Sequence, residues 1–435
     1  MLIKAAASGS LGIVNKLLPV FLFLAALSAN LLAQNYTVTD LGSLDGTSSV
    51  AYGINSSGQV VGYATSGSNS LPVLFSGNGT GIVILGNTAG TARAINDGGQ
   101  IVGMESNGTV SEPVLFSGSG SNNTSLGGLP GGTGEGTALA INNSQQIVGS
   151  SYTSSSSPAV NFVASGNADL GSVGGGSNTD GSANGINDSG IIVGQSMNVS
   201  NHVRATRFAS SGGANLDLGT LGGSSGVAYA INNANQIVGS STTALNNFHA
   251  TLFNLDGSSP IDLGTLSGSI SNAHDINNNG VIVGSASTAN RNHAFIYRNG
   301  TMLDLNSLIP ANSGVEIIEA WGINDAGQIA ASGVVGQAGA NGVINGNLRA
   351  LRLDPDSAPS VTYTIFVRAS PNRRGTVTGN QAYPAGTYVS VVAKPKSGSV
   401  FVSWTEKGRV VSRKRTYKFY VSQTRSLVAH FSPRS

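Results

Sequence analysis

The residues best suited to binding chemistry occupy one repeated position of the chain, directly after an alanine. Aromatic rings there offer faces for stacking, and the polar side chains offer charge-assisted hydrogen bonds. If they surround one opening, they suit recognition of a glycan or a peptide; the alternative is that they pack between neighbouring sheets and happen to vary. The position holds Tyr52, Arg93, Leu139, Asn184, Tyr229, His274 and Trp321, of which all except Leu139 are our candidate ligand-binding residues.

These positions belong to seven copies of one motif, Ala-x-small-Ile-Asn-x-x-Gly-Gln-Ile/Val-Val-Gly, with minor departures. Successive copies lie 41 to 47 residues apart, which is the length of one small sheet of four short strands. In the fifth copy we expect strands over residues 227–232, 236–240, 249–255 and 260–264. The Asn of the motif recurs at Asn55, Asn96, Asn142, Asn187, Asn232, Asn277 and Asn324.

The two ends of the repeat region complete each other. Residues 36–42 resemble a fourth strand without the three that should precede it, whereas the last copy ends at its third strand, residues 349–353. The sequence therefore predicts an all-β, seven-bladed β-propeller over residues 34–356, closed by the N-terminal strand. A β-solenoid is the alternative, but it has no use for this complementary truncation.

The first turn of each copy needs a residue with positive φ, usually glycine. Gln145 takes that position in the third copy, which predicts a strained or differently shaped turn. The opposite connections vary in length, and the longest that we expect covers residues 333–347. A monotonous face opposite a variable one favours a binding surface.

The N-terminus carries Lys4 and Lys16 and then an apolar stretch over residues 17–33. This pattern predicts a signal peptide over residues 1–33, with a single membrane anchor as the alternative, and no transmembrane span after cleavage. The chain has no cysteine, which excludes disulfides, thiolate nucleophiles and Cys-ligated metals. We expect a secreted protein that is extracellular or associated with the cell surface.

Charge divides the chain sharply. Residues 34–361 carry 19 acids against 7 Arg, whereas residues 362–435 carry 13 Lys and Arg against the single acid Glu406. After a linker at residues 357–361, we expect a small β module over residues 362–435, with a last strand at 417–431 and Tyr388, Phe401 and Trp404 in its core. Its candidates for binding anionic envelope polymers are Arg373, Arg374, Lys407, Arg409, Arg413, Lys414 and Arg415. The alternatives are a solvated basic surface and docking on the acidic domain, and no motif indicates specific nucleic-acid binding.

No catalytic residue, metal site or cofactor site is assigned. Residues 222–226 match the nucleophile-elbow pattern without the strand-to-helix turn that it needs, and the five His residues lack ligand spacing. A polysaccharide-acting hydrolase or lyase remains the alternative to a binding protein, and it would require two converging carboxylates. Acids of the variable face that could serve are Asp45, Glu135, Asp180 and Glu319.

Residues 36–353 resemble the bacterial extracellular HAF repeat family, whose copies combine a His-Ala-Phe strand, Asp-Leu-Gly-Thr-Leu-Gly-Gly and the Ile-Asn motif. The matching residues here are His293-Ala294-Phe295, Asp217-Leu218-Gly219-Thr220-Leu221-Gly222-Gly223 and Ala320-Trp321-Gly322-Ile323-Asn324. The resemblance implies secretion and a repeat scaffold, with no established reaction. Most copies depart from His-Ala-Phe itself, which argues against a functional role for that His.

Residues 362–431 are similar to the divergent internalin-type B-repeat module. The similarity rests on Gly375-Thr376-Val377-Thr378-Gly379, Phe401-Val402-Ser403-Trp404 and Leu427-Val428-Ala429-His430-Phe431. Such modules are spacers or adhesive units of surface proteins. Together these observations predict an exported, non-enzymatic binding or adhesion scaffold whose partners are a glycan or surface protein and an anionic envelope polymer.

Overall fold

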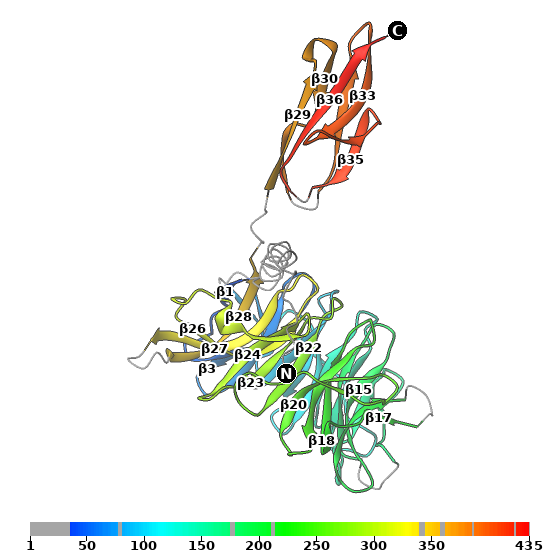
Figure 1. Cartoon of the computed structure of the whole chain (residues 1–435). Coiled ribbons are helices and arrows are strands. Elements are labelled where there is room, and N and C mark those ends of the chain that lie inside the picture. Colours follow the sequence, from blue (N-terminus) through cyan, green and yellow to red (C-terminus); the bar gives the residue numbers. More distant parts are fainter. Residues whose placement is uncertain are drawn as a thin grey trace, which may run out of the picture. The chain divides into compact units, whose positions relative to one another are not determined.

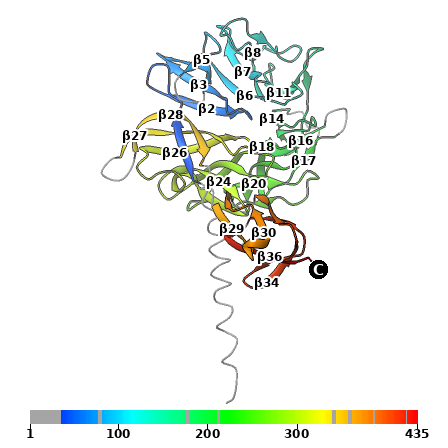
Figure 2. The ribbon, with the colours of Figure 1, turned by 90° about the horizontal axis from the view of Figure 1, so that it is seen from above.

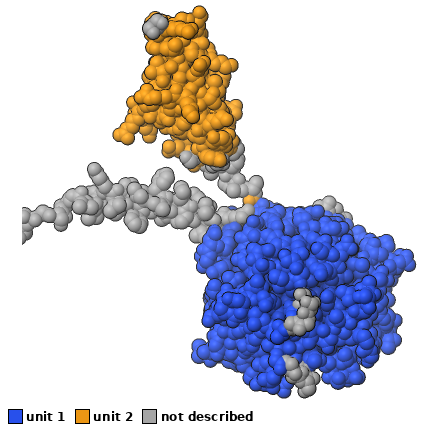
Figure 3. Space-filling view, turned by 90° about the vertical axis from the view of Figure 1, so that its right-hand side faces the viewer, with its two compact units in different colours: residues 1–355 blue, residues 356–435 orange. Residues whose placement is uncertain are grey.

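The computed structural model describes residues 35–76, 81–174, 179–209, 214–338, 344–356, 362–384, 387–421 and 423–434. These residues form an all-β protein, as the sequence predicts (Figure 1). The chain divides into two compact units, Met1–Pro355 and Asp356–Ser435 (Figure 3). The expected signal peptide and linker lie outside the described residues. No helix in the described part of the chain is long and apolar enough to span a membrane.

In its described residues, the first unit contains seven four-stranded antiparallel sheets, numbered here in chain order. Sheet 1 is β2 (Ser49–Ile54), β3 (Val60–Ser66), β4 (Asn69–Phe75) and β5 (Ile82–Ile84). Sheet 2 is β6 (Gly90–Ile95), β7 (Ile101–Ser106), β8 (Ser111–Phe116) and β9 (Thr124–Ser125). Sheet 3 is β10 (Gly136–Ile141), β11 (Ile147–Ser151), β12 (Ala159–Phe162) and β13 (Ala168–Asp169).

The next three sheets repeat this order. Sheet 4 is β14 (Gly181–Ile186), β15 (Ile192–Met197), β16 (Val203–Phe208) and β17 (Leu216–Asp217). Sheet 5 is β18 (Gly222–Ile231), β19 (Ile237–Thr243), β20 (Phe248–Phe253) and β21 (Ile261–Asp262). Sheet 6 is β22 (Ser271–Ile276), β23 (Ile282–Ser287), β24 (Asn292–Arg298) and β25 (Thr301–Asp304), and the short 3-10 helix η2 (Leu305–Ser307) follows it.

Sheet 7 joins the two ends of the repeat region. Its strands are β26 (Val315–Ile323), β27 (Ile329–Ala338), β28 (Ile344–Pro355) and β1 (Tyr36–Asp40). The first strand pairs antiparallel with β28, from Tyr36 opposite Pro355 to Asp40 opposite Leu351, and Figure 2 shows the two side by side. The expected completion of the last sheet by the N-terminal strand is therefore observed.

Each sheet packs on the next through the second residue of the Ile-Val pair in the motif. Ile101 packs in the cluster of its own sheet, whereas Val102 packs with Ala138 and Phe162 of sheet 3. Consecutive residues of a strand point to opposite faces of the sheet. The Ile of the pair therefore packs in the cluster of its own sheet, and the Val packs against the next sheet. Ala330 of sheet 7 takes the same role and packs with Ala51 of sheet 1. The last sheet in the chain therefore packs on the first, as each other sheet packs on the one that follows it.

Three details of the first unit differ from expectation. β18 begins at Gly222, ahead of the expected residue 227, because residues before it still pair with β19. The expected loop 333–347 is mostly a long hairpin, since β27 and β28 pair as far as Ala338 and Ile344. Gln145 adopts φ of 66° but keeps the turn hydrogen bond of the glycine-containing copies, from its N–H to the Asn142 carbonyl at 3.0 Å. Its departure is therefore backbone strain and not a new turn shape.

The second unit pairs two sheets. The five-stranded sheet has the order β31 (Gln381–Pro384), β29 (Thr362–Ser370), β36 (Arg425–Pro433), β33 (Ser399–Glu406) and β34 (Arg409–Ser412). The three-stranded sheet has the order β30 (Gly375–Thr378), β32 (Tyr388–Pro395) and β35 (Thr416–Tyr420). A short 3-10 helix, η3 (Asn372–Arg374), precedes β30.

Two expectations for this unit are wrong. The single strand expected at 417–431 is two strands, β35 and β36, in different sheets, because β36 pairs in parallel with β29. Tyr388 is not a core residue, since 57% of it is exposed, whereas Trp404 is fully buried and Phe401 packs against the core. The strand β31 has no counterpart in the sequence-based expectation.

Candidate functional site

Each residue of the repeated position is the extra residue of a β-bulge in the first strand of its sheet. In sheet 1, Ala51 lies opposite Gly62 and Gly53 lies opposite Val61, which leaves Tyr52 without a partner. The other six sheets show the same shift at the same place. A bulge interrupts strand alternation and redirects the side chain of the extra residue.

In six of the seven copies, the last glycine of the motif allows a close backbone approach beside this bulge. A Cβ on Gly62 would lie 1.9 Å from the carbonyl oxygen of Val50, which is impossible without moving backbone. The same close approach, at 1.9 to 2.0 Å, recurs at Gly103, Gly149, Gly194, Gly239 and Gly284. Ala331 takes this position in sheet 7, which keeps the same bulge, so the glycine accompanies the close approach but the bulge does not require it.

The seven bulge residues line one cavity of about 220 Å³. We call them the mouth residues: Tyr52, Arg93, Leu139, Asn184, Tyr229, His274 and Trp321. All six candidate ligand-binding residues lie there, together with Leu139. Residues that are about 45 positions apart in the sequence are therefore brought into one place.

An arc of aromatic contacts follows the wall of this cavity. The rings of His274 and Trp321 stack with centroids 4.4 Å apart and planes at 10°. Tyr52 meets Trp321 edge-on at 5.4 Å, and Tyr229 meets His274 edge-on at 5.9 Å. The guanidinium carbon of Arg93 lies 4.4 Å from the centroid of the Tyr52 ring, which extends the arc by a cation–π contact.

Burial keeps the aromatic part of the mouth uncharged. It lowers the pKa of His274 to about 4, and the ring accordingly donates from Nδ1 to the Ala320 carbonyl at 3.1 Å. Burial also raises the pKa values of Tyr52 and Tyr229. Asn184 donates from Nδ2 to the Ala228 carbonyl at 2.9 Å, so its amide is oriented by the neighbouring sheet.

Arg93 is the charged mouth residue, and it forms no ion pair with any described residue. Its Nε and the Nε1 of Trp321 are buried and have no hydrogen-bond acceptor among the described residues. Unpaired buried donors are uncommon in folded proteins. The mouth therefore combines ring faces with donor groups that suit an acceptor or an anion.

Asp275 is an exception beside the mouth, because the other six copies have Gly or Ala at its position. Its carboxylate accepts hydrogen bonds from the N–H groups of Ile276 and Ile323, both at 2.8 Å. Burial raises the pKa of Asp275 to about 7. Sequence reasoning did not assign Asp275 to the site.

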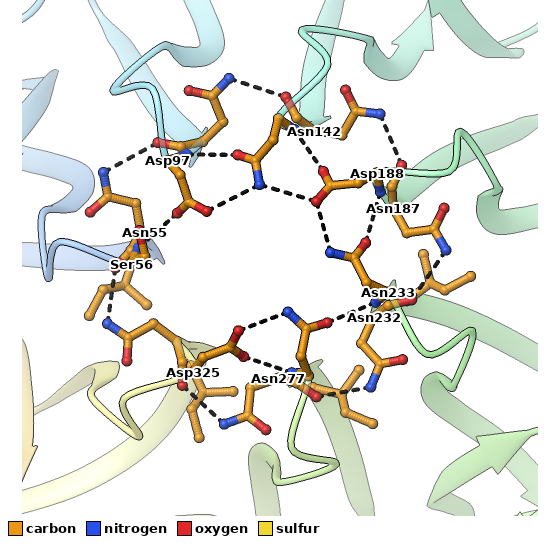
Figure 4. A pocket seen from close by; sticks show the side chains of 18 of the residues that line it. Asn55, Ser56, Asp97, Asn142, Asn187, Asp188, Asn232, Asn233, Asn277 and Asp325 are labelled. Atoms are coloured by element: carbon orange, nitrogen blue, oxygen red, sulfur yellow. Dashed lines mark hydrogen bonds between the residues drawn. The ribbon is translucent and has the colours of Figure 1, made fainter.

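A second cavity, of about 200 Å³, is surrounded by the first turns of the seven copies (Figure 4). Four residues line both cavities: Ile54, Ile95, Ile186 and Ile231. Each motif Asn donates from Nδ2 to the carbonyl of the Asn in the next sheet, at 2.9 to 3.2 Å. The Oδ1 atom of Asn55 accepts the N–H of Gln59 at 3.0 Å, so one side chain closes its own turn and joins it to the next.

Two further histidines, His249 and His293, have local acidic partners. His249 contacts Asp262 on the adjacent strand at 2.9 Å, and His293 contacts Asp304 at 2.7 Å. In sheet 4 the equivalent pair is Arg204 with Asp217. The His-Ala-Phe and Asp-Leu-Gly elements therefore supply a cross-strand pair. No group of three His, Cys, Asp or Glu that could hold a metal ion occurs within the described residues.

The acids considered for an enzyme are dispersed. Asp45 accepts hydrogen bonds from the Thr47 hydroxyl and from the N–H groups of Thr47 and Gly67, which lower its pKa to about 2. Asp180 accepts the N–H of Ser157 at 2.7 Å. Glu319 lies on β26, where burial raises its pKa, whereas Glu135 precedes β10 in sheet 3. The nucleophile-elbow match at 222–226 is part of strand β18 and does not form a strand-to-helix turn.

The basic candidates of the second unit come from three segments, residues 373–374, 407–409 and 413–415. Lys407 and Arg409 belong to the β33–β34 hairpin, and Arg413 and Lys414 lie in the connection that follows it. Arg374 and Arg415 instead lie at one end of the three-stranded sheet, where their carbonyls accept the N–H groups of Lys396 and Ala393 at 2.9 Å. Arg373 is exposed on η3.

Comparison with known proteins adds two family matches. A sequence model described as "Protein of unknown function (DUF3466)" matches residues 135–383. A model described as "Divergent InlB B-repeat domain" matches residues 365–435, which confirms the internalin-type resemblance of the second unit. No curated protein matches the chain. Among solved structures, a Mycobacterium tuberculosis puromycin-hydrolyzing peptidase is similar, with 11% identity and a TM-score of 0.46 over 79% of this chain and 60% of that one.

Proposed function

The chain belongs to the DUF3466 family, described as proteins of unknown function, and we propose that it is an exported binding scaffold that recognises a glycan. In this proposal the seven sheets are the blades of a seven-bladed β-propeller, and the mouth residues surround one end of its central channel. The cyclic series of Asn hydrogen bonds and the return of the packing series to sheet 1 support this arrangement. A β-solenoid has no such contact between its ends.

The observation that carries the binding function is the convergence of the mouth residues on one cavity. The interlocked rings of Tyr52, Trp321 and His274 offer a preformed wall, and the bulges hold them on rigid strands. A preformed aromatic site loses little conformational entropy on binding. The variability of this position within an otherwise monotonous repeat favours recognition over packing.

A sugar ring suits the chemistry of the mouth. Its C–H faces pack on aromatic rings, and its hydroxyls satisfy donors such as Trp321 Nε1 and the Arg93 guanidinium. The cavity is smaller than the roughly 300–1,000 Å³ of sites for drug-sized ligands, so it fits one terminal residue of a glycan. The unpaired charge of Arg93 favours a residue that carries a carboxylate.

The second unit supplies attachment in this proposal. Its InlB B-repeat character, and the 13 cationic residues against one acid in residues 362–435, favour contact with anionic surface polymers outside the cell. The HAF-type resemblance and the expected signal peptide favour secretion. The polysaccharide-acting enzyme is the less favoured alternative, because the carboxylates of Asp45 and Asp180 accept hydrogen bonds from backbone N–H groups of loops. Glu135 precedes the first strand of sheet 3, and Glu319 lies in sheet 7.

The test is a glycan-array screen of the full chain, followed by calorimetry with the best ligand. Trp321→Ala should weaken binding by about tenfold or more, since it removes the central stacked ring. Tyr152→Ala is the control, because Tyr152 is an aromatic residue, 44% exposed, outside the mouth. Equal affinity of wild type and Trp321→Ala would reject the mouth as the glycan site, and turnover of the glycan would favour the enzyme.

A further inference from the structure

The outer face of the three-stranded sheet in the second unit is a flat surface of mixed aromatic, hydroxyl and cationic side chains. Strand alternation defines it, because Val389, Val391 and Ala393 of β32 point into the core and the residues between them point outward. The neighbouring strands β30 and β35 alternate in the same way. We call the outward set the β32 face: Thr376, Thr378, Tyr388, Ser390, Val392, Lys394, Thr416, Lys418 and Tyr420.

One end of the β32 face is aromatic. Tyr388 and Tyr420 lie directly opposite each other on adjacent strands, with ring centroids 4.7 Å apart. They are 57% and 69% exposed, although both are large and partly apolar. The pair therefore forms a platform in solvent that contributes little to the core of the unit, which Trp404 and its neighbours fill.

The rest of the face carries two lysines, Lys418 in the residue pair next to the tyrosines and Lys394 at the far end. Lys418 lies beside Ser390, and Lys394 lies at the far end of β32, next to the backbone of Arg374 and Arg415. The one acid of residues 362–435, Glu406, belongs to the five-stranded sheet and is held by Arg425 at 2.6 Å. Glu406 is therefore engaged elsewhere and does not neutralise the lysines of the face.

We propose that the β32 face binds an extended anionic polysaccharide, lying from the tyrosine pair toward Lys394. This inference rests on the attachment role proposed above. It assigns that role to a surface that contains none of the basic candidates named from the sequence. The six-residue step from Tyr388 to Lys394 spans about 20 Å, which accommodates several sugar residues of one chain. Sugar rings pack on the tyrosines, carboxylates pair with the lysines, and the threonine hydroxyls accept or donate hydrogen bonds.

The test uses the full chain and polygalacturonate, an acidic polysaccharide, with neutral dextran and single-stranded DNA as comparison polymers, across a salt series. Tyr420→Ala/Lys418→Gln removes one ring and one charge from the face. Phe366→Ala/Arg368→Gln is the matched control, because both residues are exposed on β29 of the other sheet. Tyr388→Phe/Tyr420→Phe keeps the rings and should keep most of the affinity.

We expect the wild type to bind polygalacturonate, salt to weaken binding, and the β32-face double variant to lose about tenfold in affinity while the control loses less than about twofold. Equal losses in the two double variants would overturn the assignment of the face while leaving attachment intact. No binding by the wild type would reject attachment itself. Tighter binding to DNA than to polygalacturonate would reject a polysaccharide as the ligand of the face. Binding of polygalacturonate that strengthens as salt is added would indicate that the basic unit docks on the acidic one. Unchanged melting temperatures confirm that the exposed substitutions leave the fold intact.

Discussion

The side-chain amide of Asn324 donates a hydrogen bond to the backbone carbonyl of Asn55 at 3.0 Å, across 269 residues of sequence. The same bond joins each motif Asn to the next, so this one closes the series. The Oδ1 atom of Asn324 accepts the N–H of Gln328 within its own turn. The repeated residue is therefore an asparagine because a single short side chain must both donate and accept.

Asn324→Asp should destabilise the first unit although it changes the shape of the residue very little. A carboxylate cannot donate to the Asn55 carbonyl, so the bond between the two turns is lost and a charge lies beside a carbonyl oxygen that keeps only the N–H of Gly58. We expect the free energy of unfolding to fall by about 1–3 kcal/mol in urea titrations. Asn290→Asp, at an exposed position of the β23–β24 loop, is the control and should stay within about 0.5 kcal/mol of wild type. Equal stability of both variants would show that the closing bond contributes nothing.

Gln145→Gly should stabilise the protein. Gln145 holds φ at 66°, a conformation that glycine adopts without penalty, and its side chain is exposed. Glycine also raises the conformational entropy of the unfolded chain, which offsets part of this relief. We therefore expect the free energy of unfolding to rise by about 0.5–1 kcal/mol. Gly99→Gln is the reciprocal variant at φ of 79° and should lose a similar amount. A loss of stability in Gln145→Gly would contradict the strain.

His274 and Asp275 should give opposite pH dependences of stability. Folding raises the Asp275 pKa to about 7, so the folded chain holds this proton more tightly and the contribution of Asp275 falls as pH rises from about 4 to about 7. Folding lowers the His274 pKa to about 4, so the unfolded chain binds that proton more tightly and stability rises between about pH 4 and 6.5. In the wild type the two trends oppose each other over most of this range.

Two single variants separate these trends in urea unfolding at a series of pH values. Asp275→Asn should leave the His274 trend, so that stability relative to wild type increases with pH. His274→Gln should leave the Asp275 trend and show the reverse. Each slope should be at most about 1.4 kcal/mol per pH unit. Parallel profiles for the two variants would contradict the opposite shifts.

Arg93→Gln should reduce affinity for acidic glycans more than for neutral ones. The guanidinium has no ion-pair partner among the described residues, so an acidic ligand would provide its counter-charge. We expect about a tenfold loss with a uronic-acid ligand and about a twofold loss with the neutral sugar. Calorimetry on the matched ligand pair measures both. Equal losses would indicate that Arg93 acts by packing on Tyr52.

The repeat made much of the first unit predictable. Copies that share one pattern must form like sheets, so aligning them was enough to gather Tyr52, His274 and Trp321 at one cavity. The bulge that presents these residues was not foreseen, because an extra residue in a strand leaves no mark in hydrophobic alternation. Gly62 is the signal that could have revealed it, since a glycine in a buried strand often marks close backbone approach.

The second unit was less predictable, because it has no internal repeat to compare. Tyr388 alternates with valines and reads as a core residue, but the side of a strand that faces the core depends on which sheet covers it. The parallel pairing of β36 with β29 links distant segments, and no local turn signal reveals such a pair. The sequence therefore did not predict which residues share the β32 face, and the structure was needed to identify them.

The most direct test of glycan recognition at the mouth is tryptophan fluorescence. The chain has two tryptophans, and Trp404 is fully buried in the second unit, so ligand entering the mouth should change the emission of Trp321 alone. Titrating the full chain with the glycan selected by the array should give a saturable change in emission with the same dissociation constant as calorimetry, and Trp321→Phe should abolish that change. A glycan that binds by calorimetry with no change in emission, and with equal affinity for Trp321→Phe, would contradict the proposed site.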